Sequence, residues 1–456
     1  MNGGWKLALR NLGRNRRRNA VTGAAIALGY AGLLLLGGYG AGMERLIRNS
    51  TVYLQHLGHV RVYARGGLVK AEAKPSAFAL PRDAQEKIGA ALRADPRVEL
   101  WGSYLRGAGL VGNGCKSFTF VATGVELDVA RRVLSHPDVV ALGEDAARPR
   151  AGRRPHDAAG EESPIAVGVG LGRHRLQKSP PAVGPTSPGA PAPSAPLDCA
   201  APDWGARVAD DPYVQLAVRT HDGGFAAADA RVVGWFQGAT TELDRTAIEA
   251  PLDVLQRLYD TERVTYVAAF LRDHRTAPAV AAELGERLRA AGLDVTVHAF
   301  DDPAANPYYA GMMATIAGIL SFMALLVTAV VMLSVLNAMT LAILERTREI
   351  GTLRSLGFTR RQVVGLFLRE AAALTAISTT MGLVLALATA LAVRAAAVRI
   401  EVPGLGGEVL LSLLPTPGLV AAIAVVFLAL SLLATWIAVR RRVRERVAAL
   451  VVEVAA

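Results

Sequence analysis

The sequence has few of the residues on which small secreted folds and most enzymes depend. Cysteine occurs only 2 times in 456 positions, aromatic residues make up 6% of the chain, and charged residues make up 20%. Two cysteines are too few for the dense disulfide framework of a small secreted domain. The chain must therefore gain its stability from apolar burial, in a protein core or in lipid.

The signatures of common catalytic sites are also missing. No G-x-x-x-x-G-K-[ST] segment occurs, so we expect that the chain does not bind and hydrolyse ATP by itself. H-E-x-x-H, G-x-S-x-G and C-x-x-C are absent as well, which argues against three common classes of enzyme site. We predict a non-enzymatic chain with no catalytic, cofactor-binding or metal-binding residues of its own.

Apolar residues are abundant, at 52% of the chain, and the mean hydropathy is +0.31. They concentrate in four runs, each longer than the roughly 20 residues that a helix needs to cross a bilayer core. The runs are Ala20 to Gly42, Ala310 to Leu344, Ala371 to Ala397 and Gly418 to Val439. This pattern predicts a membrane protein with four transmembrane helices.

The net charge of +11 does not indicate a nucleic-acid partner, because the basic residues gather at the ends of the apolar runs. Such clusters mark cytoplasmic segments by the positive-inside rule. We therefore expect both termini in the cytoplasm. The clusters comprise Lys6, Arg10, Arg14, Arg16, Arg17 and Arg18; Arg346, Arg348, Arg354, Arg360 and Arg361; and Arg440, Arg441, Arg442, Arg444 and Arg446.

The long segment between the first two runs alternates strand-like and helix-like stretches. This alternation predicts a large α+β domain in the periplasm, inserted between helices 1 and 2. Residues 58–63 and 231–236 are typical of strands, and residues 84–94 and 278–291 are typical of helices, the second with Gly292 at its C-cap. A tract at about 178–211 is rich in proline and alanine, and we interpret it as a flexible insertion.

These features predict nine segments along the chain. They are a cytoplasmic amphipathic helix (1–19), transmembrane helix 1 with a stalk (20–48), the periplasmic domain (49–305), a stalk with transmembrane helix 2 (306–344), a cytoplasmic coupling loop (345–362), transmembrane helix 3 (363–397), a short periplasmic loop (398–417), transmembrane helix 4 (418–439) and a cytoplasmic tail (440–456).

Two pairs of residues in the expected outer domain could carry chemistry. Cys115 and Cys199 would both lie in an oxidising compartment, so a disulfide between them is possible, and two free thiols are the alternative. His56 and His59 are the nearest approach to a metal pair. Three residues apart and without further ligands, they are more often solvated side chains, and we predict no metal site.

The loop between the second and third runs is the most informative segment. Residues 345–356 can form a short amphipathic helix, Gly357 suits the position after its end, and Thr359 with Gln362 forms a capping box for the next helix. A short helix with an apolar edge could dock into a groove on a partner. Composition alone favours a simpler alternative, in which the helix lies among lipid headgroups and its arginines only fix topology.

This loop resembles the E-R-x-x-E-I-G-x-L-[RK]-[AS]-[LI]-G signature of FtsX/MacB-type ABC permeases, also called type VII or mechanotransmission transporters. Residues 7–18, 58–62 and 233–252 are similar to further blocks of the same family, closest in layout to its lipoprotein-releasing LolC/LolE branch. The tract at 178–211 departs from that pattern. The resemblance implies an ATPase-coupling role for Glu345, Arg346, Glu349, Ile350, Gly351, Leu353, Arg354, Leu356 and Gly357.

The resemblance also implies that the chain lies in the inner membrane of a bacterial cell, and it implies partners and a mechanism. Two ABC ATPase subunits would bind ATP and Mg, and a second permease copy or a paralogue would complete the complex, with membrane lipids around it. A periplasmic adaptor or a lipoprotein carrier is a further possible partner. ATP hydrolysis would move the periplasmic domains, for lipoprotein release or for export. The alternative is an FtsX-like regulator that activates a periplasmic cell-wall hydrolase without transport.

Overall fold

The computed structural model describes residues 16–443 except 72, 141, 143–146, 159, 183–197, 239, 346, 348–350, 353–354 and 402–407. Most of the predicted amphipathic helix at 1–19 and of the predicted tail at 440–456 therefore lies outside the described residues. The chain divides into two compact units. The first holds residues 1–45, 313–398 and 411–456, and the second holds residues 46–312 and 399–410.

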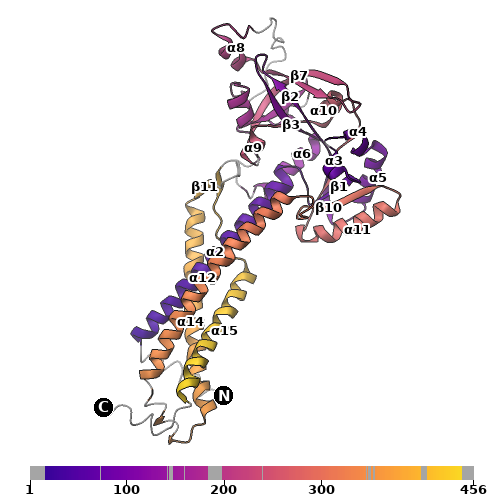
Figure 1. Cartoon of the computed structure of the whole chain (residues 1–456). Coiled ribbons are helices and arrows are strands. Elements are labelled where there is room, and N and C mark those ends of the chain that lie inside the picture. The colour runs from indigo at the N-terminus through magenta and orange to yellow at the C-terminus, as the bar shows by residue number, and fades with distance from the viewer. Residues whose placement is uncertain are drawn as a thin grey trace. The chain divides into compact units, whose positions relative to one another are not determined.

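Four long helices form the first unit, α2 (Arg16–Asn49), α12 (Pro307–Glu345), α14 (Arg360–Ala395) and α15 (Pro417–Val443). They lie together as a bundle (Figure 1) around a buried apolar cluster that includes Ile26, Leu34 and Phe427. All four are long and apolar enough to cross a membrane. The four spans predicted from the apolar runs correspond to these helices.

Small residues allow these helices to approach each other closely. A Cβ atom on Gly29 of α2 would lie 2.2 Å from the Val331 side chain of α12, and one on Gly382 of α14 would lie 2.5 Å from a backbone oxygen of α2. Thr375 of α14 donates a 2.7 Å hydrogen bond to Ser431 of α15. Close backbone approach and hydroxyl contacts are the means by which helices associate in lipid, where apolar burial between them gains little.

The second unit contains a mixed sheet of ten strands. Its path runs β10 (Val295–Ala299), β1 (Val60–Ala64), β9 (Tyr266–Leu271), β2 (Val98–Gly112), β3 (Ser117–Val125), β8 (Ala247–Pro251), β5 (Pro164–Gly168), β7 (Phe225–Phe236) and β4 (Ala151–Gly152), while β6 (Tyr213–Arg219) pairs with β2 and β7. The β3–β8 and β5–β7 pairs are parallel, and the others are antiparallel. A separate hairpin joins β11 (Arg399–Glu401) and β12 (Glu408–Leu410).

The first four strands of that path form a recognisable subdomain. With the helices α5 (Arg82–Arg93) and α11 (Ala277–Ala290), they follow each other as strand, helix, strand, strand, helix, strand, and the spatial order β10-β1-β9-β2 is that of a split β-α-β fold. Strand β2 is long, and its second half continues into the rest of the sheet. The predicted strands at 58–63 and 231–236 and the predicted helices at 84–94 and 278–291 are confirmed, and Gly292 has the positive φ of a helix C-cap, +77°.

Shorter elements complete the second unit. They are the π-helices η1 (Ser50–Leu54) and η3 (Gly170–Arg175), the 3-10 helices η2 (Pro155–Asp157) and η4 (His274–Thr276), and the α-helices α3 (Gly67–Lys70), α4 (Pro75–Phe78), α6 (Leu127–Leu134), α7 (Pro137–Val140), α8 (Trp204–Asp210), α9 (Thr241–Asp244) and α10 (Leu252–Tyr259).

A disulfide joins Cys115, in the turn between β2 and β3, to Cys199, with their Cα atoms 5.5 Å apart. It ties the proline- and alanine-rich tract to that turn. The two ends of the tract also meet, because the buried Lys178 ammonium lies 3.6 Å from the Asp211 carboxylate. The central part of the tract, residues 183–197, lies outside the described residues.

The expectation that His56 and His59 are solvated is wrong, since each side chain is only 3% exposed. His59 Nδ1 accepts a 2.9 Å hydrogen bond from the Leu271 N–H of β9. Burial lowers the pKa of His59 to about 3, so its ring is neutral at pH 7. The pattern suggests exposure because two polar residues precede a strand, but both residues are buried in the folded unit.

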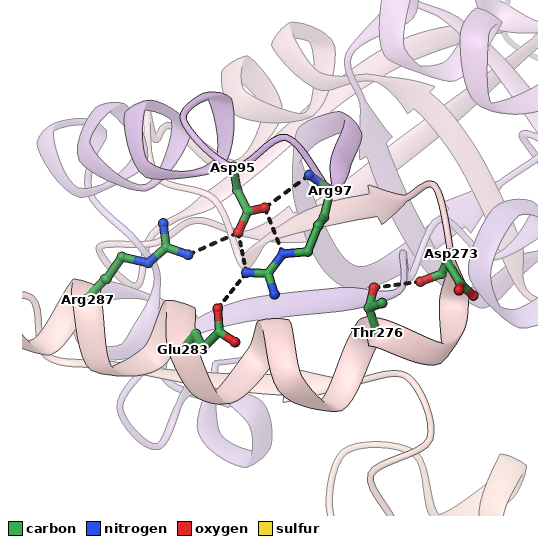
Figure 2. A network of polar contacts seen from close by, with 6 residues as sticks. All are labelled: Asp95, Arg97, Asp273, Thr276, Glu283 and Arg287. Carbon is green, nitrogen blue, oxygen red and sulfur yellow. Dashed lines mark hydrogen bonds and ion pairs between the residues drawn. The ribbon is translucent and has the colours of Figure 1, made fainter.

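A polar network fixes the turn between α5 and β2 (Figure 2). The Asp95 carboxylate accepts hydrogen bonds from Arg97 at 2.7 and 2.9 Å and from Arg287 of α11 at 3.0 Å, and Arg97 also bonds to Glu283. The guanidinium of Arg97 holds the pKa of Asp95 well below its usual range, although burial opposes this. The network therefore holds α11 to the start of β2 with a charged, buried carboxylate.

We expect Asp95→Ala to destabilise the second unit by about 2–3 kcal/mol, since it removes several charge-assisted hydrogen bonds to one buried carboxylate. Glu283→Ala is the matched control, because it removes only the exposed partner in the same network and should change stability little. Urea unfolding of the two variants measures the difference. Equal midpoints for both would mean that Asp95 does not anchor this turn.

Candidate functional site

The predicted coupling segment connects α12 to α14 and stands on a small apolar cluster. Ile343 of α12, Val363 and Phe367 of α14, and Ala438 and Val439 of α15 are all at most 9% exposed and pack together. This cluster brings the ends of three helices to one place. It thereby gives the segment between Glu345 and Arg360 a fixed base.

The end of the segment has the turn geometry that its sequence indicates. Gly357 has a φ of +92°, in the left-handed region that glycine adopts without strain. Thr359 caps α14, and its side chain and that of Gln362 form the reciprocal hydrogen bonds of a capping box. The predicted tight turn into a new helix is present at Gly357 and Thr359.

The structure describes only part of the predicted coupling set. Glu345 is exposed at the end of α12, Gly351 is buried, and Leu356 and Gly357 are exposed. The remaining members lie outside the described residues, namely Arg346, Glu349, Ile350, Leu353 and Arg354. Their assignment to a partner surface stays a prediction.

Two large apolar side chains flank Gly357 and face solvent. Leu356 is 74% exposed and Phe358 is 46% exposed. The sequence pattern selected Leu356 but not Phe358, because only Leu356 falls on the apolar edge of the expected short helix. The position of Phe358 directly after the glycine turn could have identified it, because an apolar residue between two helices cannot pack on the apolar face of either one. An exposed apolar pair on a rigid turn is suited to insertion into a partner's groove.

A second candidate lies in the α+β unit, where a buried charge cluster joins three separate segments. The Glu249 carboxylate of β8 lies 2.9 Å from an Arg154 nitrogen and 3.5 Å from Nε2 of His56. Burial raises the pKa of Glu249, but Arg154 and then His56 outweigh burial, and the net pKa falls to about 2. The carboxylate is therefore charged and holds the segment after η1 to the middle of the sheet.

A cavity of about 70 Å³ adjoins this cluster and is lined by both His56 and Glu249. Glu249 Oε1 and the two ring nitrogens of His56 are buried and have no hydrogen-bond partner among the described residues. His56 itself has a φ of +56°, which is unusual for a residue with a side chain. The junction between η1 and β1 is thus a strained and polar element inside an otherwise apolar core.

Comparison with known proteins identifies the carboxyl-terminal part of the chain. Residues 321–447 match the family model described as FtsX-like permease C-terminal. This range contains α14, α15, most of α12 and the whole predicted coupling segment. No curated protein matches the chain.

Two solved structures are similar to the chain. One is the extracellular domain of the noncanonic ABC-type transporter YknZ from Gram-positive bacteria, with 11% identity, a TM-score of 0.30, and coverage of 52% of this chain and 98% of that chain. The other is the periplasmic region of MacB from Actinobacillus actinomycetemcomitans, with 12% identity, a TM-score of 0.33, and coverage of 54% and 92%.

Proposed function

We propose that the chain is the multi-pass permease subunit of an FtsX/MacB-type ABC transporter and that it couples ATP hydrolysis by separate ATPase subunits to movement of its α+β unit. The observation that carries the proposal is the coupling segment. It lies inside the family match and ends in a capped turn with Leu356 and Phe358 exposed. The complex would contain two ATPase subunits, which bind ATP and Mg. Each ATPase subunit would bind the turn of one permease in a groove on its surface.

The length of α12 supports a mechanical role. Its 39 residues span about 58 Å at 1.5 Å per residue, nearly twice the roughly 30 Å hydrocarbon core. A continuous helix of this length transmits displacement along its axis, because its hydrogen bonds resist compression and bending. We propose that movement at the ATPase end of α12 reaches the α+β unit in this way.

We place both termini in the cytoplasm and the α+β unit in the periplasm of a bacterial cell, with the chain in the inner membrane. A variant without native thiols that carries Ser355→Cys should not react with an impermeant maleimide in intact spheroplasts, whereas the same background with Ala200→Cys should react. Both positions are at or near the surface, so access depends on the side of the membrane. Labelling of position 355 in intact spheroplasts would show that the orientation is the opposite of the one proposed.

For the substrate, we propose release of a lipoprotein from the membrane or export across the envelope, in a complex with a second permease copy or a paralogue. Depletion of the chain should then leave lipoproteins in the inner membrane, which membrane fractionation and mass spectrometry would detect. Co-purification with an ATPase and with an adaptor or carrier would support the transporter. Co-purification with a cell-wall hydrolase and unchanged lipoprotein distribution would favour the regulatory alternative instead.

A further inference from the structure

The first half of β2 is an open sheet edge. Its inner side pairs with β9 from Val98 to Tyr104, while its outer side pairs with β3 only from Tyr104 onward. At Val125 the chain leaves the sheet and enters α6. In the part of the chain that the structure describes, no strand covers residues 98–103 on this outer side.

The direction of the backbone groups follows from two hydrogen bonds. The Ser103 N–H donates to the Glu126 carboxylate on the outer side of β2, at 2.8 Å. Backbone groups alternate along an antiparallel strand, so the N–H and C=O of Trp101 also point outward. Ala269, the residue opposite Trp101 on β9, supports this direction. Its carbonyl accepts a hydrogen bond from the His59 N–H and therefore points away from β2. Trp101 therefore offers one donor and one acceptor to an added strand.

These groups open into a groove of about 440 Å³, with α5 on one side and α6 on the other. The groove has an apolar floor, since Leu92 is 1% exposed, Val129 is 8% exposed and the indole of Trp101 is partly exposed. The indole lies against α5 because Gly89 has no side chain, and a Cβ atom there would be 2.5 Å from the ring. The floor is thus fixed before anything binds.

The unpaired charge at the groove is positive. Arg93 of α5 and Arg132 of α6 line it, and neither forms an ion pair with a carboxylate among the described residues. Arg93 lies over the Trp101 ring at 5.5 Å. Of the two acidic residues of the lining, Asp128 lies 3.5 Å from Arg131, and Glu99 lies 3.7 Å from His136, which is charged only when it is protonated. An occupant with carboxylates would complement the two arginines.

We propose that this groove binds an extended acidic polypeptide segment of a partner protein, which adds to the sheet as a strand beside residues 98–103. Main-chain hydrogen bonds to the Trp101 region set its direction. Side chains on one face of the added strand contact Trp101 and Arg93, and side chains on the other face contact Val129 and Arg132, so each face carries an apolar residue and a carboxylate. The network of Asp95 and Arg97 holds the turn before β2 (Figure 2), so the edge is rigid and binding costs little ordering. The inference goes beyond the proposed function and does not rest on it.

The test uses the full-length chain in detergent and a fluorescent peptide of about twelve residues in which pairs of valines alternate with pairs of glutamates. Both residue types then occur on both faces of the added strand, and the peptide is long enough to cover the open edge. Fluorescence anisotropy should detect binding. N-methylation of alternate amides should weaken it about tenfold or more, as should exchange of every glutamate for lysine. On the protein side, the double variant Arg93→Glu/Arg132→Glu should weaken binding to a similar degree. Hydrogen exchange of the Trp101 amide should slow when the peptide binds.

Arg257→Glu is the matched control, because Arg257 is an exposed arginine of the same unit, on α10, with its own partner Asp253. It should leave peptide binding unchanged. Absence of binding, equal binding of the N-methylated peptide, or unchanged exchange at Trp101 would each overturn the proposal. If gel filtration shows that the double variant is not folded, the proposal is tested by comparing how the modified and unmodified peptides bind to the unmodified chain.

Discussion

Leu356→Asp is expected to lower the affinity of the chain for its ATPase about a hundredfold or more, which corresponds to about 2.7 kcal/mol. The side chain is 74% exposed, so the substitution removes no packing within the chain. In a partner's apolar groove, however, the new carboxylate would be buried without a counter-ion, and the cost of desolvating it is several kcal/mol. Co-purification with the ATPase and its stimulated hydrolysis measure the loss.

Leu356→Met is the matched control, since methionine is also apolar and has a similar volume. This variant should retain both association and stimulation. Thermal stability and insertion into the membrane should be the same for both variants, because Gly357 and the Thr359 cap are untouched. If the Leu356→Asp protein still co-purifies fully with its ATPase, the coupling role is wrong. The segment would then lie among lipid headgroups, which is the alternative that composition favours.

Acidification from pH 7 to pH 4 is expected to destabilise the α+β unit by about 3 kcal/mol through His59. The pKa of His59 is lowered to about 3 in the folded chain, against an ordinary value of 6.5. In the unfolded chain His59 is therefore protonated below about pH 6.5, whereas in the folded chain it is protonated only below about pH 3. The stabilisation is fully present above pH 6.5 and is lost as the pH falls towards 3.

Glu249 adds to this acid sensitivity over a lower range. Its pKa is about 2 in the folded chain and ordinarily 4.5, so its contribution is present above pH 4.5 and is lost as the pH falls towards 2. The two residues can therefore be separated by pH. Loss of stability between pH 6.5 and 4.5 includes His59, together with His156 and His221, whose pKa values burial also lowers. Further loss below pH 4.5 includes Glu249.

His59→Gln tests this assignment, because an amide oxygen can accept from the Leu271 N–H but does not titrate in this range. The midpoint of urea unfolding should fall less between pH 6.5 and pH 4.5 in His59→Gln than in the unmodified chain. The exposed His174 supplies the control, since His174→Gln should leave the pH dependence unchanged. Equal pH dependence in His59→Gln and the unmodified chain would rule out His59 as the titrating group.

The sequence determined the features that depend on local patterns. The four spans follow from apolar runs. In lipid no water is available to bond polar groups, so the backbone must form a helix and the side chains that face lipid must be apolar. The cap at Thr359 and the left-handed turn at Gly357 follow from residues a few positions apart, whose hydrogen bonds close without tertiary contacts. The strands and helices at 58–63, 84–94, 231–236 and 278–291 were found for the same reason.

Only the tertiary structure decided which distant residues meet. His56 lies beside Glu249 because β8 pairs with β3, far along the chain, and no local pattern distinguishes this buried histidine from a solvated one. The open edge at Trp101 exists because β3 ends at Val125 while β2 continues, and the relative lengths of paired strands are set by register and packing. Local sequence fixes which elements form, whereas burial and strand pairing fix which of their side chains remain available.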